Sequence, residues 1–450
     1  MVRTDLGEVE DSGNLNLLAK DTVIIISVQI AGLALAYLVQ IFLARWMGKT
    51  EYGIYEYVIS WSLVLAIPIS FGLPRAVLRF ISEYRVRQEW GELRGLLISS
   101  WQFIIGVGLL FCLVAIQIIA YLDAQNSFTY APVLMAGIWL IPLQGLSQLQ
   151  EDISRGIDNL LLAYGPSKLL WPTLILGSSL FFSYQNQDLT SLLAIQIALF
   201  TLLIIIIFQF IYLNIKLNRE IGEVKPVYIP IHWLSVAFPL LLERTFDTLL
   251  TQTDILTVGI MIGPGAVGAY STAAKTAVWA SFILQSLNFA AAPTYAILYA
   301  QNSQDQLQEF VSTITLWIFV PSIVIAAILI IFAKSFLSLF GSEFLEAAWA
   351  LRIIVIGYLV DVISGCVGNL VVMTGYQNKA AVVSICCALL NLGLNVVLIP
   401  YYGIIGAAIA TASTIIISNV WLCIISIAEI NINPTIFYSF SRLRKLENNV

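Results

Sequence analysis

The chain has 450 residues, of which 59% are hydrophobic and only 11% charged, and its formal net charge is −5. A soluble protein carries roughly 25% charged residues, so this composition excludes a soluble globular protein. The sequence shows no basic tail or stripe of the kind that follows phosphates, which argues against nucleic acid as a partner. We therefore expect an all-α polytopic membrane protein, because helices satisfy their own backbone hydrogen bonds in lipid.

Twelve apolar runs are long enough to cross a bilayer, since a helical span needs about 20 residues. In chain order they lie at 22–44, 53–73, 95–121, 130–149, 160–183, 190–214, 233–262, 267–297, 310–333, 346–373, 380–399 and 404–428. The two longest hydrophilic stretches are short, at about 75–94 and 215–231. These runs predict an N-terminal six-helix bundle at 22–214, a linker at 215–231 and a C-terminal six-helix bundle at 232–428.

Basic residues gather on the side that holds both termini and the even-numbered connections. The opposite side holds only Arg45, Lys49 and Lys334. By the positive-inside rule, the segment 1–21, the linker 215–231 and the tail 429–450 are expected in the cytoplasm, in a cell-membrane protein. No loop is large enough for a catalytic domain and no phosphate-binding G-x-x-x-x-G-K-[ST] loop is present, so we expect neither an enzyme nor an ATP-driven pump. Five cysteines in apolar runs and one histidine, His232, predict no metal site.

A short motif occurs twice, at an offset of 215 residues. The connection after the first span reads Gly48-Lys49-Thr50-Glu51-Tyr52-Gly53-Ile54-Tyr55, and the one after the seventh reads Gly263-Pro264-Gly265-Ala266-Val267-Gly268-Ala269-Tyr270. Both fit the pattern G-x-x-x-x-G-x-Tyr, in which the first glycine can end one helix, the second can begin the next, and the tyrosine lies at the membrane interface. The matching context predicts two parallel six-helix repeats, which is a transporter architecture with the substrate site between the halves.

Several segments in this order resemble the polysaccharide flippases of the multidrug/oligosaccharidyl-lipid/polysaccharide exporter superfamily. The resemblance rests on Phe42–Gly48 with Tyr52–Tyr55, on Phe71–Arg75 with Arg79–Tyr84, on Asp254–Leu256 with Gly268–Tyr270, and on Asn391–Asn395 with Ile399–Ala408. It covers nearly the whole chain. It implies a V-shaped protein of two bundles that alternates between inward-open and outward-open states. The implied substrate is a lipid-linked oligosaccharide of the polyprenyl-pyrophosphate type, whose sugar headgroup crosses through a polar cavity.

Two departures bear on the type of flippase that the resemblance implies. Lipid-II flippases carry basic residues within the first helix, whereas none lies between Lys20 and Arg45 here. They also have additional C-terminal helices that this sequence does not show. Both departures favour the O-antigen and capsule type over the peptidoglycan type.

Charged residues inside the seventh predicted span are candidates for the substrate cavity. Glu243, Asp247 and Asp254 recur on one helical face, and Arg244 lies three residues from Asp247. A charged residue at mid-helix costs roughly 2.5–3.5 kcal/mol in lipid, so a stripe of them is expected to line a hydrated path. The competing interpretation is that the helix begins late and that Glu243 and Arg244 form an interfacial ion pair. It does not apply to Asp254, which lies well inside the apolar run.

Two further charges and two amides complete this candidate set. Lys275 in the eighth span and Asp361 in the tenth are expected in the cavity or in structural pairs. Because the turn at 264–265 makes the seventh and eighth spans an antiparallel hairpin, Asp254 and Lys275 should lie at similar depth, and we predict an ion pair between them. Asn391 and Asn395 share a face of the eleventh span and are expected to form interhelical hydrogen bonds.

Arg75 and Arg79 follow the second span at positions i and i+4. One interpretation is ordinary positive-inside anchoring; the other is that they meet a pyrophosphate at the cytoplasmic mouth. The expected partners are therefore the lipid-linked glycan, membrane lipid and other polysaccharide-synthesis proteins. No cofactor is expected beyond a coupling H⁺ or Na⁺.

Two alternative functions remain open at this point. An organic-cation or multidrug exporter of the same superfamily should carry a net negative cavity, whereas Arg244 and Lys275 stand beside the carboxylates here. A non-transporting scaffold of a polysaccharide-synthesis complex should tolerate neutralisation of the intramembrane charges.

Overall fold

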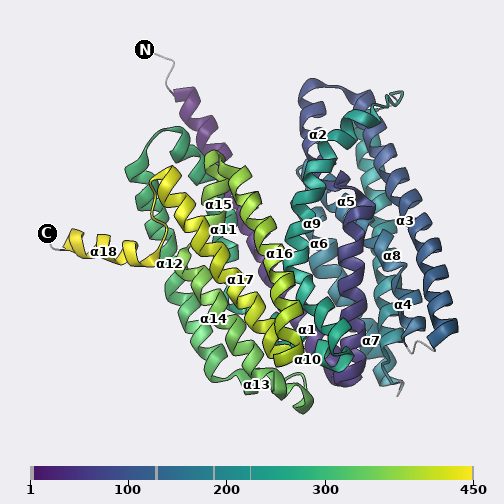
Figure 1. Ribbon diagram of the computed structural model, residues 1–450. Helices are drawn as coiled ribbons and strands as arrows, with labels where there is room; N and C mark the ends of the chain where they lie inside the picture. Colours follow the sequence, from purple (N-terminus) through teal and green to yellow (C-terminus); the bar gives the residue numbers. More distant parts are fainter. Residues whose placement is uncertain (1–4, 127–129, 186–187, 223, 448–450) are drawn as a thin grey trace. The chain divides into compact units, whose positions relative to one another are not determined.

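A computed structural model describes residues 5–126, 130–185, 188–222 and 224–447, except for the side chains of 5–26, 125–126, 221, 243, 247, 289–290 and 443–447. Within these ranges the chain is helical and contains no strand. It forms two compact units, of which the first comprises Met1–Leu43 with Trp61–Thr245 and the second Ala44–Ser60 with Phe246–Val450. The expectation of an all-α polytopic fold is confirmed (Figure 1).

The first unit is organised around α5. Helix α5 packs against α2, α3, α6 and α8, and α7 packs against α8 on the far side. The small residues Gly145 and Gly156 allow this close approach: a Cβ at Gly156 would lie 3.0 Å from the side chain of Ile81. The helices of this unit, with α1 and α9 shared by both units, are α1 Asp5–Ser70, α2 Leu73–Arg87, α3 Trp90–Asn126, α4 Ala131–Gly137, α5 Leu140–Gly156, α6 Leu160–Gly165, the π-helical turn Pro166–Leu170, α7 Trp171–Tyr184, α8 Ser191–Ile221 and α9 Pro230–Met261.

The second unit is organised around α14 and α17. Helix α17 packs along both α14 and α16, and α14 also packs against α10 and α12 (Figure 1). A core of small and branched side chains fills the space between them. The remaining elements are α10 Pro264–Ala277, a 3₁₀ turn Val278–Ala280, α11 Phe282–Ala300, α12 Gln304–Ile331, α13 Ala333–Ser338, a 3₁₀ turn Ser342–Ala347, α14 Ala348–Ser364, α15 Val367–Val371, a π turn Val372–Tyr376, α16 Gln377–Tyr402, α17 Ile404–Ile425, a π turn Ser426–Ile430 and α18 Ile436–Glu447.

Every predicted span falls on helix. Among the described residues, eight helices are long and apolar enough to cross a membrane. One of them, Ser27–Ser70, covers most of the first two predicted spans, 22–44 and 53–73. The predicted spans 160–183, 233–262 and 267–297 fall on helices outside these eight. The count of twelve stays a prediction.

Both first glycines of the repeated motif end a helical segment, as the motif predicts. Gly48 interrupts α1 with φ 74°, and Gly263 precedes α10 with φ 123°. These backbone conformations are in the region that glycine adopts without steric cost. The helical path is therefore interrupted at the same position of the motif in both of its copies.

The segments that follow these turns, 49–53 and 264–268, pack against each other and are called here the glycine seam. A Cβ at Gly53 would lie 1.8 Å from the carbonyl oxygen of Pro264, and a Cβ at Gly268 would lie 2.2 Å from the carbonyl oxygen of Lys49. The offset of 215 relates Lys49 to Pro264 and Gly53 to Gly268, so the two contacts exchange partners as a two-fold axis requires. Only glycine permits this backbone approach on both sides.

The glycine seam explains where the units differ from the predicted bundles. The sequence assigned residues 44–60 to the N-terminal bundle at 22–214, whereas Ala44–Ser60 packs with the second unit. The boundary between the units lies after Thr245, inside α9, rather than in the predicted linker 215–231. Hydropathy marks where helices begin and end, but it does not tell which helices pack together.

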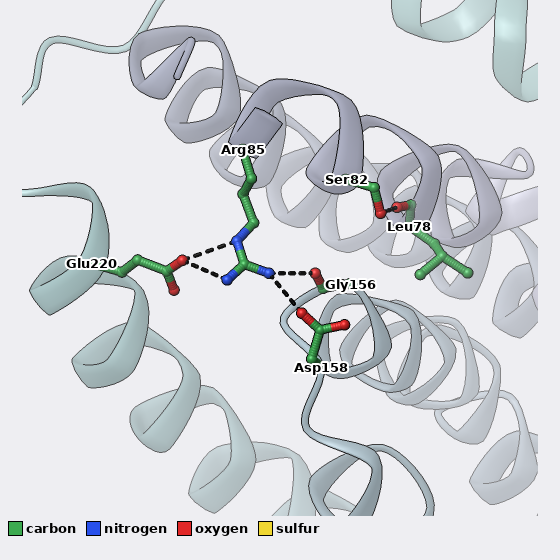
Figure 2. A network of polar contacts seen from close by, with 6 residues as sticks. All are labelled: Leu78, Ser82, Arg85, Gly156, Asp158 and Glu220. Carbon is green, nitrogen blue, oxygen red and sulfur yellow. Dashed lines mark hydrogen bonds and ion pairs between the residues drawn. The ribbon is translucent and has the colours of Figure 1, made fainter. Parts of the chain in front are cut away.

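Arg85 ties three segments of the first unit together at the end of α2 (Figure 2). Its Nε and Nη2 donate to Glu220 near the end of α8, at 2.9 and 2.8 Å. Its Nη1 donates to the carbonyl oxygen of Gly156 at the end of α5 and to the Asp158 carboxylate, both at 3.1 Å. The planar guanidinium thus holds three helix ends at fixed separations.

Replacing Arg85 by alanine is expected to destabilise the first unit by about 1–2 kcal/mol, since four charge-assisted contacts are lost at a site partly screened by solvent. The melting temperature of the purified protein in detergent, followed by circular dichroism, should fall by a few degrees. Arg87→Ala is the matched control, because Arg87 makes only an exposed pair with Glu83. Equal melting temperatures for the two variants would contradict the role of the network.

Candidate functional site

A charged cavity of about 110 Å³ opens in the first unit where α2 and α9 cross, and is called here the arginine cavity. The crossing depends on Gly72, which begins α2 with φ 70° and whose Cβ would lie 2.3 Å from the carbonyl oxygen of Ala237. This close approach brings two arginines to one cavity: Arg75 from the first turn of α2 and Arg244 from the middle of α9. Two arginines distant in sequence therefore share one site.

Helix α5 supplies the rest of the polar lining. Gln148, Glu151, Asp152 and Arg155 follow the spacing i, i+3, i+4, i+7, which places them on one face of the helix. Arg155 Nη1 donates to Asp152 at 2.8 Å. The Glu151 carboxylate accepts a weak bond from Ser167 Oγ at 3.4 Å. This polar face of α5 therefore forms one wall of the arginine cavity.

The charge of the arginine cavity suits an anionic ligand. The part of its lining that the structure describes contains three arginines and two carboxylates. Arginine presents several donors in a planar fork that matches phosphate and carboxylate oxygens. Arg79, which the sequence paired with Arg75, is exposed and does not line this cavity. The structure therefore brings Arg75 together with Arg244 rather than with Arg79.

The second unit holds a separate polar cluster around Asp254, called here the Asp254 cluster. The buried Asp254 carboxylate accepts hydrogen bonds from Tyr270 Oη at 2.8 Å, from Asn395 Nδ2 at 2.9 Å and from Thr411 Oγ1. Asn395 Nδ2 also donates to Asn391 Oδ1 at 3.0 Å. The prediction of an interhelical hydrogen bond is confirmed for Asn395, which joins α16 to α9, whereas Asn391 accepts from Asn395 within α16.

One acceptor of the Asp254 cluster is unsatisfied among the described residues. Asn395 is fully buried, and its Oδ1 has no hydrogen-bond donor there. A buried acceptor without a partner costs about 1–3 kcal/mol, and such a group calls for an explanation. A cation or a proton beside the Asp254 carboxylate would meet oxygen ligands from α9, α16 and α17.

The predicted ion pair between Asp254 and Lys275 is wrong in this structure. Lys275 Nζ instead contacts the buried carboxylate of Glu56 at 2.5 Å, and Asp254 is held by neutral donors. The hairpin fixes the depth of each residue, but the rotation of α10 about its axis decides which neighbour Lys275 faces. Glu56 is 2% exposed and lies three residues after Gly53, so the glycine seam brings it to α10.

The other predicted cavity residues are placed as follows. Asp361 in α14 is partly exposed and lies beside the Asn419 side chain of α17, in the second unit. Glu243 and Asp247 lie in α9, but their side chains are outside the described part of the structure. Their predicted role in the substrate cavity stays a prediction.

Sequence reasoning missed the contribution of α5 and of Glu56. The predicted span 130–149 ended before Glu151, whereas α5 continues to Gly156. The spacing of Gln148, Glu151, Asp152 and Arg155 was the available signal, since it marks one polar helical face. For Glu56, the signal was an acid directly inside an apolar span beside the repeated motif.

Comparison with known families fits this arrangement. Residues 18–299, more than half of the chain, match the model of the family described as "Polysaccharide biosynthesis protein". The chain belongs to this family. Residues 239–397 also match the MatE family model. The resemblance inferred from the sequence is therefore confirmed.

One relative and two solved structures are similar to this family member in sequence or in fold. It is 30% identical over 173 residues to the probable low-salt glycan biosynthesis flippase Agl15 of Haloferax volcanii, a match that covers 37% of this chain and 36% of that relative. Its fold is similar to that of the lipid II flippase MurJ, with TM-score 0.70, 17% identity and coverage of 89% and 87% of the two chains. It is equally similar to an inward-facing MATE multidrug resistance transporter, with TM-score 0.70, 12% identity and coverage of 95% and 99%.

Proposed function

We propose that this protein is a flippase that moves a lipid-linked oligosaccharide of the polyprenyl-pyrophosphate type across the cell membrane by alternating access. The observation that carries the proposal is the arginine cavity, in which, among the residues whose side chains the structure describes, Arg75, Arg155 and Arg244 stand beside two carboxylates. Such a lining favours an anionic pyrophosphate over an organic cation. The cavity is therefore the proposed headgroup site, and both chain termini are proposed to lie in the cytoplasm.

The lining residues suit the two chemical parts of such a headgroup. Arg75 and Arg244 come from different helices, so their guanidinium forks can approach a pyrophosphate from two directions. Glu151 and Asp152 offer carboxylate oxygens that can accept hydrogen bonds from sugar hydroxyls. The combination of cations and acceptors in one cavity is what a glycan linked through pyrophosphate requires.

The Asp254 cluster is the proposed site of the coupling ion. A proton or Na⁺ could bind the Asp254 carboxylate, with Asn395 Oδ1 as an additional oxygen ligand. Buried acids in membrane helices commonly mark ion pathways. Because the cluster joins α9, α16 and α17, its occupancy would change how these helices pack.

The glycine seam is the proposed closed contact at the external side of the transport cycle. Its two segments were both predicted on the side opposite the termini, and they meet through backbone atoms at Gly53 and Gly268. Alternating access requires a contact that forms in one state and opens in the other. A close, side-chain-free contact is suited to forming and breaking as a unit.

A test of the headgroup site uses Arg244. In a strain that lacks the gene, lipid-linked glycan should accumulate on the cytoplasmic leaflet and surface polysaccharide should be lost. Arg244→Ala should fail to restore surface polysaccharide, whereas Arg244→Lys should restore it in part because it keeps the positive charge. Protein levels should stay near normal, which immunoblotting of membranes would check.

Arg219→Ala is the control, because Arg219 is an exposed arginine of the same unit outside the cavity. Full complementation by Arg244→Ala would exclude the headgroup role. Unchanged surface glycan with increased sensitivity to cationic dyes in the deletion strain would favour the organic-cation exporter. If the deletion strain loses surface glycan and every charge-neutralised variant restores it, the scaffold function is favoured.

A further inference from the structure

A second cavity of the first unit, of about 280 Å³, lies between α3 and α8 and is called here the α3–α8 groove. Both helices pack against α5, which leaves a groove between them with Ile153 of α5 at its floor. Each helix contributes residues at the spacing i, i+3, i+4, i+7 and i+8, so one continuous face of each helix lines the groove. The residues are Arg94, Leu97, Ile98, Trp101 and Gln102 on α3, and Phe210, Leu213, Asn214, Leu217 and Asn218 on α8.

The α3–α8 groove has a charged residue at one end and an aromatic pair, beside Gln102, at the other. Arg94 lies one turn after the start of α3, and Asn214 and Asn218 lie within two turns of the end of α8. Trp101 and Phe210 stand deeper, with their rings in an edge-to-face contact at 4.6 Å. At 1.5 Å per residue, Trp101 is about 10 Å further along the helix than Arg94. The charge and the aromatic pair are therefore separated by about the distance from a lipid headgroup to the upper part of an acyl chain.

The Arg94 guanidinium is held in place by the backbone. Its Nη1 donates to the carbonyl oxygens of Gly222 and Val224, at 3.2 and 3.1 Å, in the segment that follows α8. Among the described residues these are its only hydrogen bonds, and no carboxylate pairs with it. Its Nε and Nη2 donors remain for an anion, and the two backbone contacts orient the guanidinium.

We propose that the α3–α8 groove binds an anionic phospholipid of the cytoplasmic leaflet, with its phosphate at Arg94 and one acyl chain along Trp101 and Phe210. The charge of Arg94 complements the phosphate, and the carboxamides of Asn214 and Asn218 suit a polar headgroup. The aromatic pair and the leucines provide an apolar surface that runs along the helices, as an acyl chain does.

This lipid site is distinct from the headgroup site of the proposed transport function. Ile153 lines the α3–α8 groove, whereas the adjacent residue Asp152 lines the arginine cavity. Successive residues of a helix point about 100° apart, so the two sites lie on different faces of α5. A bound phospholipid would pack against the back of the helix that carries Glu151, Asp152 and Arg155.

Fluorescence quenching tests the site on the purified full-length protein in detergent. Brominated phosphatidylglycerol should quench tryptophan fluorescence more strongly than brominated phosphatidylcholine, and the excess should vanish in Trp101→Phe, which removes the reporter in the groove. Arg94→Gln should weaken the apparent affinity for phosphatidylglycerol about tenfold, as the loss of a hydrogen bond to a charged group predicts.

Asn218 provides a pair of variants that leaves Arg94 and its backbone contacts intact. Asn218→Glu places a negative charge at the polar end and should abolish the preference for phosphatidylglycerol, whereas Asn218→Gln should keep it. Asn218 is exposed, so both variants should fold. Equal quenching by the two lipids in the unmodified protein, or a full preference in Asn218→Glu, would overturn the proposal.

Displacement of brominated phosphatidylglycerol by a polyprenyl phosphate at much lower concentration would assign the groove to that lipid instead. Neither result depends on whether the protein transports glycan.

Discussion

Valine at position 53 is expected to keep the glycine seam from closing and to abolish transport. The added Cβ would overlap the carbonyl oxygen of Pro264, 1.8 Å away, and that oxygen belongs to backbone that cannot rotate aside. Overpacking of this kind typically costs 1–3 kcal/mol, and about this much is enough to shift a two-state equilibrium strongly toward the state in which the seam is open. Surface polysaccharide in the complemented deletion strain should fall to the level of the deletion itself.

Disulfide cross-linking reports on the seam directly. A Cβ at Gly265 would lie 3.7 Å from Thr50 Oγ1, so a protein with Thr50→Cys and Gly265→Cys should cross-link readily under mild oxidation. Adding Gly53→Val should suppress this cross-link. Gly393→Val is the matched control in α16, where a Cβ meets nothing within 4 Å, and cross-linking should persist there. Efficient cross-linking and transport in the Gly53→Val background would show that the seam tolerates a side chain.

Replacing Asp254 by asparagine is expected to remove ion coupling while leaving the protein folded. The amide has nearly the same shape as the carboxylate, and Tyr270 and Thr411 can both still donate to its oxygen. The negative charge that would hold H⁺ or Na⁺ is lost. In proteoliposomes, an imposed Na⁺ or proton gradient should accelerate transport by the unmodified protein and leave Asp254→Asn at its gradient-free rate.

Asp305→Asn is the control for this experiment, because Asp305 is an exposed acid in the first turn of α12, outside the Asp254 cluster. It should respond to the gradient as the unmodified protein does. If Asp254→Asn also responds fully, the cluster is a structural hydrogen-bond network and the ion binds elsewhere.

Much of the fold could be predicted because hydropathy and turn chemistry are local properties of the chain. The apolar runs correspond to helices, and Gly48 and Gly263 break the helical path where the repeated motif places them. Packing between helices is not local. The pairing of Lys275 with Glu56 depends on how α10 is rotated and on which helix the glycine seam brings beside it. Sequence spacing determines neither quantity.

The sequence predicted only those residues of the candidate site that are charged and lie within apolar runs. Arg244 and Asp254 were recognised because charges within spans are costly. Glu151 and Asp152 were missed because the apolar run ended just before them, and polar residues at a helix end resemble a connection. That α5 continues as helix, with this face toward Arg75 and Arg244, is a consequence of tertiary packing around Gly145 and Gly156.

The reciprocal contacts of the glycine seam have the geometry of an isologous interface within a single chain. In a symmetric dimer the same surface patch serves both subunits, and residue i contacts j while j contacts i. Here Lys49 meets Gly268 and Pro264 meets Gly53, which is that relation between two covalently joined repeats. A side chain added to either glycine obstructs the same backbone contact. The two positions are therefore subject to one steric constraint.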